Sequence, residues 1–145
     1  MHALNEFTLQ SVIELENPFI DPLTFFPGAT QDVLDAHADW LKPRHLDPES
    51  GRLIFCFQSY IVRTPHHTIL IDSCIGNDKN RPNRPDWHFR QGSFLADLAA
   101  AGLQPEDIDF VMCTHLHADH IGWNTRLLDG RWVPTFPNAR YVIGR

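Results

Sequence analysis

The first half of the chain contains short segments in which apolar and polar residues alternate. Alternation with a period of two favours β-strands, and it predicts strands at residues 7–16, 53–63 and 68–72. The residues 64–67 between the last two segments include Pro65 and are typical of a hairpin turn. The pattern therefore predicts a sheet that begins with three strands, of which two are joined directly.

Two further segments have the composition and the end signals of helices. Thr30 can cap a helix that continues to Leu41 and ends before Pro43, because proline interrupts the helical hydrogen bonds. Residues 93–101 are rich in Ala and Leu and are followed by glycine, a common residue at helix ends. Residues 17–28 hold three Pro and three Phe, and they predict an apolar loop.

The most informative segment follows a fourth predicted strand. Residues 108–113 are apolar and rich in strand formers, and they predict a buried strand that ends at Thr114. Directly after it, residues 115–120 read His-Leu-His-Ala-Asp-His. Such side chains must be solvated, hydrogen-bonded or bound to a metal. Imidazole nitrogens and carboxylate oxygens are ligands of zinc, so the segment predicts a metal site.

The spacing of these four residues argues against a helix. His115 and His117 are two residues apart, and helical side chains two apart point in different directions. Asp119 and His120 are adjacent, so a turn must aim both at a common centre. We therefore expect a loop at the carboxyl end of a strand, where α/β proteins tend to build their sites.

Residues 114–122, Thr-His-Leu-His-Ala-Asp-His-Ile-Gly, resemble the His-x-His-x-Asp-His signature of the metallo-β-lactamase-fold hydrolases. Asp72, between Ile71 and Ser73, also matches that family, which has an Asp at the end of an earlier strand near the metals. Residues 130–144 are similar to members with lactonase-like or esterase-like activity. The resemblance extends over most of the chain from Phe55 onward.

The resemblance implies a role for each residue of the signature. His115 and His117 would bind a first metal, and Asp119 and His120 a second. Two Zn²⁺ ions are expected, although imidazole and carboxylate ligands also suit other divalent metals. A hydroxide shared by the metals would attack an ester, a lactone or a similar bond of a small-molecule substrate. Asp119 would also be catalytic, by passing a proton to the leaving group.

Four other residues have two interpretations each. Asp72 could orient a metal ligand from behind, or it could simply cap the turn that ends its strand. Phe25, Phe26 and Trp123 could line an apolar substrate pocket, or they could be ordinary packing residues. Trp123 stands where many members of the family have a second glycine after Gly122, so the pocket is expected to differ in shape.

The family resemblance also predicts that the chain is an incomplete domain. The complete fold is an αββα sandwich of two similar halves, and residues 1–145 resemble its N-terminal half, an α/β arrangement. The remaining ligands of the family, two His and a bridging Asp, have no counterpart here. No His follows His120, and the one later Asp, Asp129, lies in a predicted turn. A half-fold exposes a sheet face, so we expect self-association.

Charge, apolar segments and cysteine positions indicate which binding partners and which cellular compartment to expect. The chain has 12 Lys and Arg against 18 Asp and Glu, a net charge of −6, which is unfavourable for nucleic-acid binding. No apolar window is long enough to predict a membrane span, and we expect a cytoplasmic protein. Cys56 and Cys113 lie in apolar strands and are predicted to be buried, whereas Cys74 is expected close to the site.

Three functions are compatible with these residues. The first is a zinc-dependent hydrolase of the metallo-β-lactamase fold. The second is a di-iron redox relative of the same fold, and the third is a metal-binding fragment without catalytic activity. The four ligand types do not choose among these functions by themselves.

Overall fold

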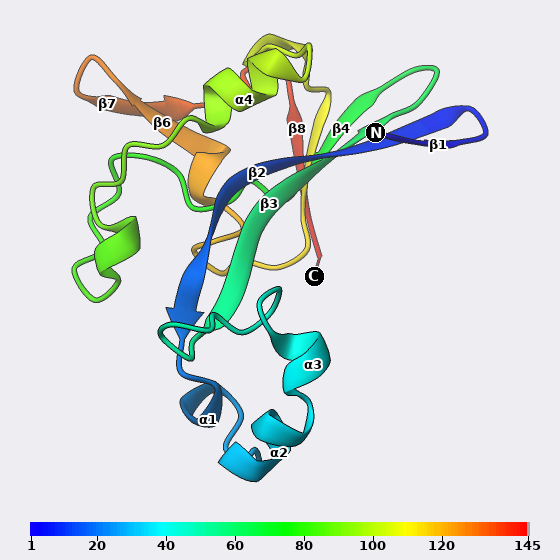
Figure 1. The fold of residues 1–145 in the computed structure, drawn as a ribbon. Coiled ribbons are helices and arrows are strands. Elements are labelled where there is room, and N and C mark those ends of the chain that lie inside the picture. The colour runs from blue at the N-terminus through cyan, green and yellow to red at the C-terminus, as the bar shows by residue number, and fades with distance from the viewer. Residues whose placement is uncertain (145) are drawn as a thin grey trace. The chain divides into compact units, whose positions relative to one another are not determined.

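A computed structural model describes residues 1–144, apart from the side chain of Leu4 (Figure 1). The chain divides into two compact units, one made of residues 1–14 together with residues 57 onward, and the other of residues 15–56. The second unit holds three short helices, α1 (Pro22–Phe25), α2 (Gln31–Ala36) and α3 (Ala38–Leu41). The residues of the predicted metal loop all belong to the first unit.

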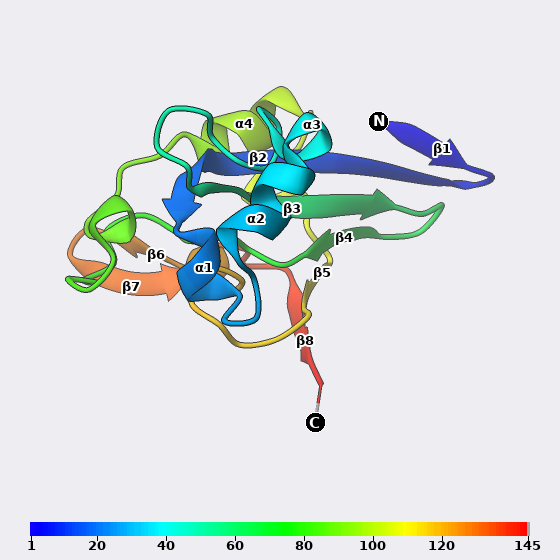
Figure 2. The ribbon, with the colours of Figure 1, turned by 60° about the horizontal axis from the view of Figure 1, so that its bottom comes forward.

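The main element is a six-stranded sheet in the order β1-β2-β3-β4-β5-β8. Its strands are β1 (His2–Leu4), β2 (Phe7–Ile20), β3 (Leu53–Arg63), β4 (Thr68–Ile71), β5 (Phe110–Cys113) and β8 (Arg140–Ile143). β3 and β4 are antiparallel, whereas β4, β5 and β8 are parallel. Figure 2 shows β2, β3 and β4 side by side, with β5 and β8 beyond β4. The mixed α/β class predicted from the sequence is confirmed.

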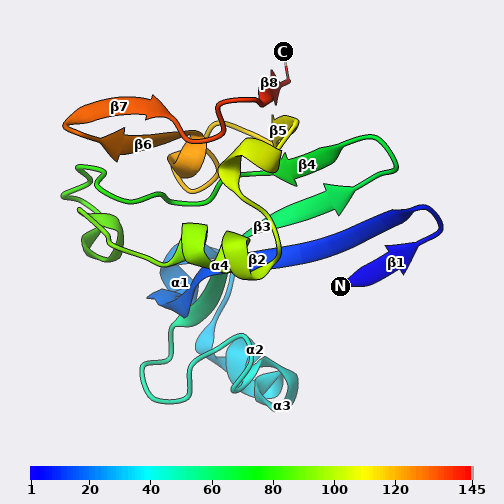
Figure 3. The same ribbon diagram turned by 90° about the horizontal axis from the view of Figure 1, so that it is seen from above.

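A separate hairpin is formed by β6 (Thr125–Leu128) and β7 (Arg131–Pro134). Asp129 and Gly130 join the two strands and both have positive φ, 49° and 76°, as a tight turn requires. The turn predicted at Asp129 is therefore confirmed. Figure 3 shows this hairpin standing apart from the main sheet.

The core lies on one face of the sheet. Ile61, Leu70 and Val111 are fully buried there, and register pairing places them in one row across β3, β4 and β5. Phe94 and Leu98 of α4 (Phe94–Ala100) join the same cluster. The helix predicted at residues 93–101 is thus confirmed, and its apolar stripe covers this face.

The opposite face carries a second apolar row. Tyr60, Ile71, Met112 and Val142 are paired in register across β3, β4, β5 and β8. Tyr60, Met112 and Val142 are 39–40% exposed. This "open row" is unusual for a soluble sheet, because exposed strand positions are normally polar.

Several local predictions need correction. β2 continues to Ile20, so the predicted loop begins four residues later. The helix predicted at residues 30–41 is divided at His37 into α2 and α3, neither of which has a buried residue to hold it to a core. β5 is buried on one face only, since Met112 is exposed. Cys56 is exposed as well, because the buried positions of β3 are Phe57, Ser59 and Ile61.

Other predicted elements agree closely with the structure. β3 has the predicted bounds, and β4 follows it through the predicted turn. The chain continues to β8 (Arg140–Ile143), and Arg145 lies outside the described residues. Within the described part of the chain, the helices are too short and insufficiently apolar to cross a membrane.

Candidate metal-binding site

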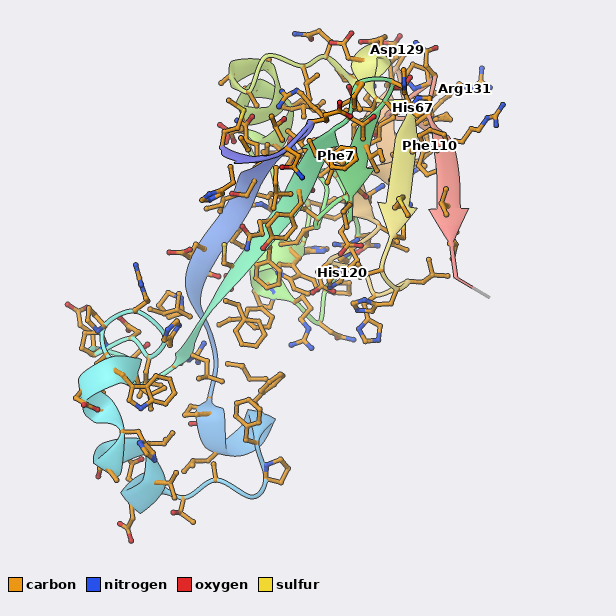
Figure 4. The ribbon with its side chains drawn as sticks, turned by 90° about the vertical axis from the view of Figure 1, so that its right-hand side faces the viewer. Phe7, His67, Phe110, His120, Asp129 and Arg131 are labelled. Carbon is orange, nitrogen blue, oxygen red and sulfur yellow. The ribbon has the colours of Figure 1, made fainter. Side chains whose placement is uncertain are left out.

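The predicted ligands lie on a loop that follows β5. Residues 114–121 connect the end of β5 to a short 3-10 helix, Gly122–Asn124. The ring of His115 lies 4.5 Å from that of His117 and 3.9 Å from that of His120, measured between centroids. Nε2 of His120 is 3.5 Å from a carboxylate oxygen of Asp119. Figure 4 shows His120 at the end of the sheet opposite to His67 and Phe110.

Asp72 meets this loop from the neighbouring strand. β4 and β5 are parallel, so their carboxyl ends share one edge of the sheet. The Asp72 carboxylate accepts hydrogen bonds from the backbone N–H of Thr114 at 2.8 Å and from its hydroxyl at 2.8 Å. It also lies 2.8 Å from Nδ1 of His120. Asp72 therefore contacts a predicted ligand directly, and it does more than end its strand.

These contacts determine which nitrogen each imidazole presents. The Asp72 carboxylate accepts a hydrogen bond at Nδ1 of His120, which favours the tautomer with its proton on Nδ1. The lone pair of Nε2 is then available to another partner. The Thr114 hydroxyl donates to Asp72 and lies 3.1 Å from Nδ1 of His115, where its oxygen can accept a hydrogen bond from the ring N–H. Two of the three imidazoles thus have Nδ1 engaged and Nε2 available, as metal-binding histidines require.

Backbone hydrogen bonds hold the segment after β4 against the predicted ligand loop. The N–H of Ser73 donates to the carbonyl of His120 at 2.8 Å, and the N–H of Gly122 donates to Cys74 at 2.7 Å. Gly122 is so close to the other segment that a Cβ atom on it would lie 1.8 Å from the carbonyl oxygen of Ile75. Only glycine fits there, and the two segments form one rigid unit.

Two residues with a role in this arrangement were not predicted. Glu14 of β2 is 6% exposed, and its carboxylate accepts hydrogen bonds from Ile75, Gly76 and Trp123. The alternation of β2 could have revealed it, because Glu14 is two residues from the buried Val12. The second is Arg81, whose guanidinium donates to the carbonyls of Ile75 and Ala118, and burial lowers its pKa.

A cavity of about 500 Å³ borders the loop. His117 and Asp119 line one side of it, and Arg81, Arg84 and Trp87 line another. The guanidinium carbons of Arg81 and Arg84 lie 5.8 and 5.6 Å from the centre of the Trp87 ring. The cavity therefore combines two cationic groups and an aromatic surface with two of the predicted metal ligands.

Of the two interpretations of Trp123, the structure agrees with ordinary packing in the core. Its side chain is 4% exposed, stacks on Phe94 at 5.4 Å and donates its indole N–H to Glu14 at 2.8 Å. It is a core residue, because the Gly122 contact turns the chain inward at this point. Phe25 and Phe26 are exposed, contact one another and belong to the other unit, so their place in a pocket stays a prediction.

The donor set fits divalent metals in its chemistry, but it is partial. Three imidazoles and a carboxylate are suitable ligands, and two imidazoles are already oriented by Asp72 and Thr114. Among residues 1–144, however, no three His, Cys, Asp or Glu side chains converge as a complete metal site would require. Cys74 is buried with its thiol 3.1 Å from the hydroxyl of Ser59, and its backbone carbonyl accepts a hydrogen bond from Gly122 at the end of the loop.

Sequence comparison now identifies the fold family. A sequence model of the metallo-beta-lactamase superfamily matches residues 58–142, which is more than half of the chain. The chain belongs to the metallo-beta-lactamase superfamily. This confirms the family indicated by residues 114–122. A comparison with curated proteins gave no match.

Three solved structures are similar to this chain in fold. The hydrolase AbOPH of the beta-lactamase superfamily matches with a TM-score of 0.71 and 28% identity, over 97% of this chain and 42% of its own. A probable metal-dependent hydrolase from Staphylococcus aureus matches with a TM-score of 0.73 and 22% identity, over 97% and 47%. AidC, a dizinc quorum-quenching lactonase in complex with a product, N-hexanoyl-L-homoserine, gives 0.71 and 22%, over 97% and 42%. The chain thus spans less than half the length of these structures.

Proposed function

We propose that this chain supplies half of the active site of a metal-dependent hydrolase that cleaves an ester, lactone or similar bond. His115 and His117 would hold one divalent cation, and Asp119 and His120 a second. The observation that carries the proposal is the 2.8 Å contact between Asp72 and Nδ1 of His120, which prepares Nε2 for a metal. The hydrolases and the dizinc lactonase among its structural relatives support zinc and this class of reaction.

In the proposed reaction, the bound cations and the side chains of this chain would have different roles. Bound divalent cations would lower the pKa of water and polarise the bond under attack. Asp119 lies beside His120 and borders the cavity, where it could give a proton to a leaving group. The cavity would hold the substrate against His117 and Asp119, with the Trp87 ring and the arginines facing its remaining atoms.

We propose further that the rest of the site comes from a second half-domain. The open row of Tyr60, Ile71, Met112 and Val142 is suited to cover by another sheet, as in the αββα arrangement. The larger size of the matching structures supports the same idea. A second half-domain would also supply the ligands that the four described donors lack.

Zinc titration of the purified chain tests the metal assignment. We expect substitution of His115 or His120 by Ala to lower Zn²⁺ affinity at least about tenfold, because each removes a ligand. His66→Ala is the matched control, since His66 lies on the exposed turn after β3. Isothermal titration calorimetry and elemental analysis give the affinity and the stoichiometry. Equal binding by all four proteins would contradict the assignment.

Turnover tests the second half of the proposal. The chain, with and without the coding region that follows it in the gene, would be assayed on a panel of esters and lactones. We expect hydrolysis only when the added region brings the remaining ligands. Full activity of the 145-residue chain would contradict the half-site, whereas metal binding without turnover by the longer protein would favour the non-catalytic alternative.

A further inference from the structure

Glu14 is a buried acid that the proposed chemistry does not use. It lies on β2, where Val12 and Glu14 both face inward, with exposed fractions of 4% and 6%. Burying a carboxylate is unfavourable unless its charge is matched by donors. An apolar residue would be the ordinary choice beside Val12, so the contacts of Glu14 indicate what its charge does.

Three N–H groups point at the Glu14 carboxylate. The backbone N–H of Ile75 donates to Oε2 at 2.6 Å, and that of Gly76 donates to Oε1 at 3.1 Å. The indole N–H of Trp123 also donates to Oε1, at 2.8 Å. Hydrogen bonds to an ionised acceptor are about twice as strong as neutral ones, so one side chain binds two separate segments firmly.

The two segments are those that carry the proposed metal ligands and their support. Ile75 and Gly76 end the segment that begins with Asp72, which orients His120. Trp123 follows His120 by three residues, and its own N–H donates to the carbonyl of Ser73 at 2.8 Å. Glu14 therefore connects the segment that carries Asp72 to the segment that carries His120. We call this meeting of residues 72–76 and 120–123 the junction.

Arg81 completes the junction from the other side. It donates to the carbonyl of Ile75 at 2.8 Å and to that of Ala118, inside the ligand loop, at 3.0 Å. The Ile75 residue is thus held by Glu14 at its N–H and by Arg81 at its carbonyl. Ile75 is itself fully buried, and a Cβ on Gly76 would lie 2.6 Å from Gly122, so the segments have no room to slide.

From these contacts we propose that Glu14 is a positioning residue for the metal-binding loop. Its carboxylate fixes the segment of residues 72–76 and the segment of residues 120–123 in one register, and so keeps Asp72 on Nδ1 of His120. The inference rests on the proposed function, because it assigns Glu14 to the same donors. The Glu14 carboxylate contacts Ile75, Gly76 and Trp123, and it acts on the proposed donors through these three residues.

The test compares Glu14→Gln with Glu16→Gln. Glutamine keeps the shape of Glu14 but places an NH₂ group against an N–H donor, so one hydrogen bond is lost. Glu16 lies on the same strand and is exposed, which makes it a matched control. Two measurements are made on the full chain: amide hydrogen exchange resolved by residue, and titration with Co²⁺ followed by visible absorption.

We expect Glu14→Gln to speed exchange about tenfold at Ile75, Gly76 and Gly122, since one buried donor is left unsatisfied. Exchange at Leu98 and Val111 in the core is expected to change much less. Co²⁺ affinity should fall about tenfold and the absorption bands should shift, as when an outer residue of a metal site is removed. Glu16→Gln should match the unsubstituted chain in both measurements.

The outcomes separate this inference from the proposed function. Unchanged exchange at Ile75, Gly76 and Gly122 would overturn the role of Glu14 whether or not metal binds. Faster exchange at all amides alike, including Leu98, would show an ordinary contribution to stability and would also overturn it. Faster local exchange with unchanged Co²⁺ affinity would overturn the claim that Glu14 positions the metal-binding residues. An unsubstituted chain that binds no Co²⁺ would instead count against the proposed function.

A second variant covers the case in which Glu14→Gln does not fold. Trp123→Phe removes only the indole donor and keeps an aromatic ring against Phe94. We expect a smaller change in the same direction, with exchange at Gly122 a few times faster and weaker Co²⁺ binding. No change in either measurement would overturn the inference.

Discussion

At the scale of single residues, a few polar side chains determine the geometry of the site. Asp72 has the left-handed φ of 57°, which turns its carboxylate back toward Thr114 and His120. Asp is one of the residues that tolerate this conformation well. The free-energy cost of this backbone conformation is offset by three contacts to the Asp72 carboxylate. They come from the backbone N–H of Thr114, the Thr114 hydroxyl and Nδ1 of His120. Substitution at such residues should therefore change the site more than the fold.

Asp72→Asn tests this at constant backbone shape, because Asn also tolerates positive φ. An amide cannot stabilise the Nδ1 proton of His120 as a carboxylate does, so we expect Zn²⁺ affinity to fall about 10- to 100-fold. Asp129→Asn is the control, since Asp129 has a φ of 49° but lies in the β6–β7 turn. Calorimetric titration measures both, and equal affinities would show that Asp72 is only a turn residue.

Cys56 offers a test of local electrostatics. Partial burial, a hydrogen bond to Glu16 and the charge of Glu16 raise the pKa of the Cys56 thiol to about 11. Because the thiolate is the reactive form, we expect alkylation by iodoacetamide at pH 8 to be at least about tenfold slower than for an ordinary cysteine. The rate should increase with pH up to that pKa. Glu16→Gln should accelerate alkylation, and mass spectrometry of the labelled peptide measures the rate. An alkylation rate that is the same with and without Glu16 would contradict the assignment.

At the scale of elements, the site depends on two loops that leave neighbouring parallel strands. β4 and β5 end at the same edge, so the segments that follow them must pass one another closely. At Gly122 the loops leave no space for a side chain, because an added Cβ would lie 1.8 Å from the carbonyl oxygen of Ile75. Steric fit between the loops, in addition to hydrogen bonding, therefore holds the ligand loop in place.

Gly122→Ala should be strongly destabilising for this reason. The added Cβ would lie 1.8 Å from backbone atoms of Ile75, which cannot rotate away as a side chain can. We expect a loss of about 3 kcal/mol or more in the free energy of unfolding, measured by urea denaturation. Gly28→Ala is the control, because no atom lies within 4 Å of its added Cβ. A similar small effect of both substitutions would mean that the loops are not tightly opposed.

At the scale of the whole chain, one face of the sheet is covered by α4 and the other presents the open row. Exposed apolar rows of this kind mark surfaces that bind another protein part. The chain spans less than half the length of the structures it matches, and no three of the described His, Cys, Asp or Glu side chains converge on a metal site. Both observations favour an active site completed by a second half-domain that covers this face.

The open row also predicts association of the isolated chain. We expect size-exclusion chromatography with light scattering to show oligomers, because burying Met112 and Val142 removes apolar surface from water. Replacing both by Thr should move the mass toward that of a monomer. The control replaces Leu127 and Leu128, which are 41% and 50% exposed on β6, by Thr. A monomer before substitution, or an equal effect of both pairs, would contradict the prediction.

Local pattern was sufficient for much of the fold and for the central motif. The bounds of β3, the turn after it and the helix α4 follow from residues that are neighbours in sequence. The four proposed ligands were found for the same reason, since they occupy six consecutive positions and share a short loop. The predictions of one continuous helix at residues 30–41 and of a buried Cys56 needed correction, because core contact and strand facing were unknown.

The sequence by itself determined the family, the position of the proposed ligand loop and the strands β2 to β5, because these depend on short-range order along the chain. Tertiary structure alone decided that Asp72 contacts His120, that Trp123 is buried, and that Glu14 joins segments 61 and 109 residues away. Such contacts arise from strand register and loop packing, which bring distant residues together at one edge of the sheet. Periodicity along the chain records which side a residue faces, but not which partner it meets there.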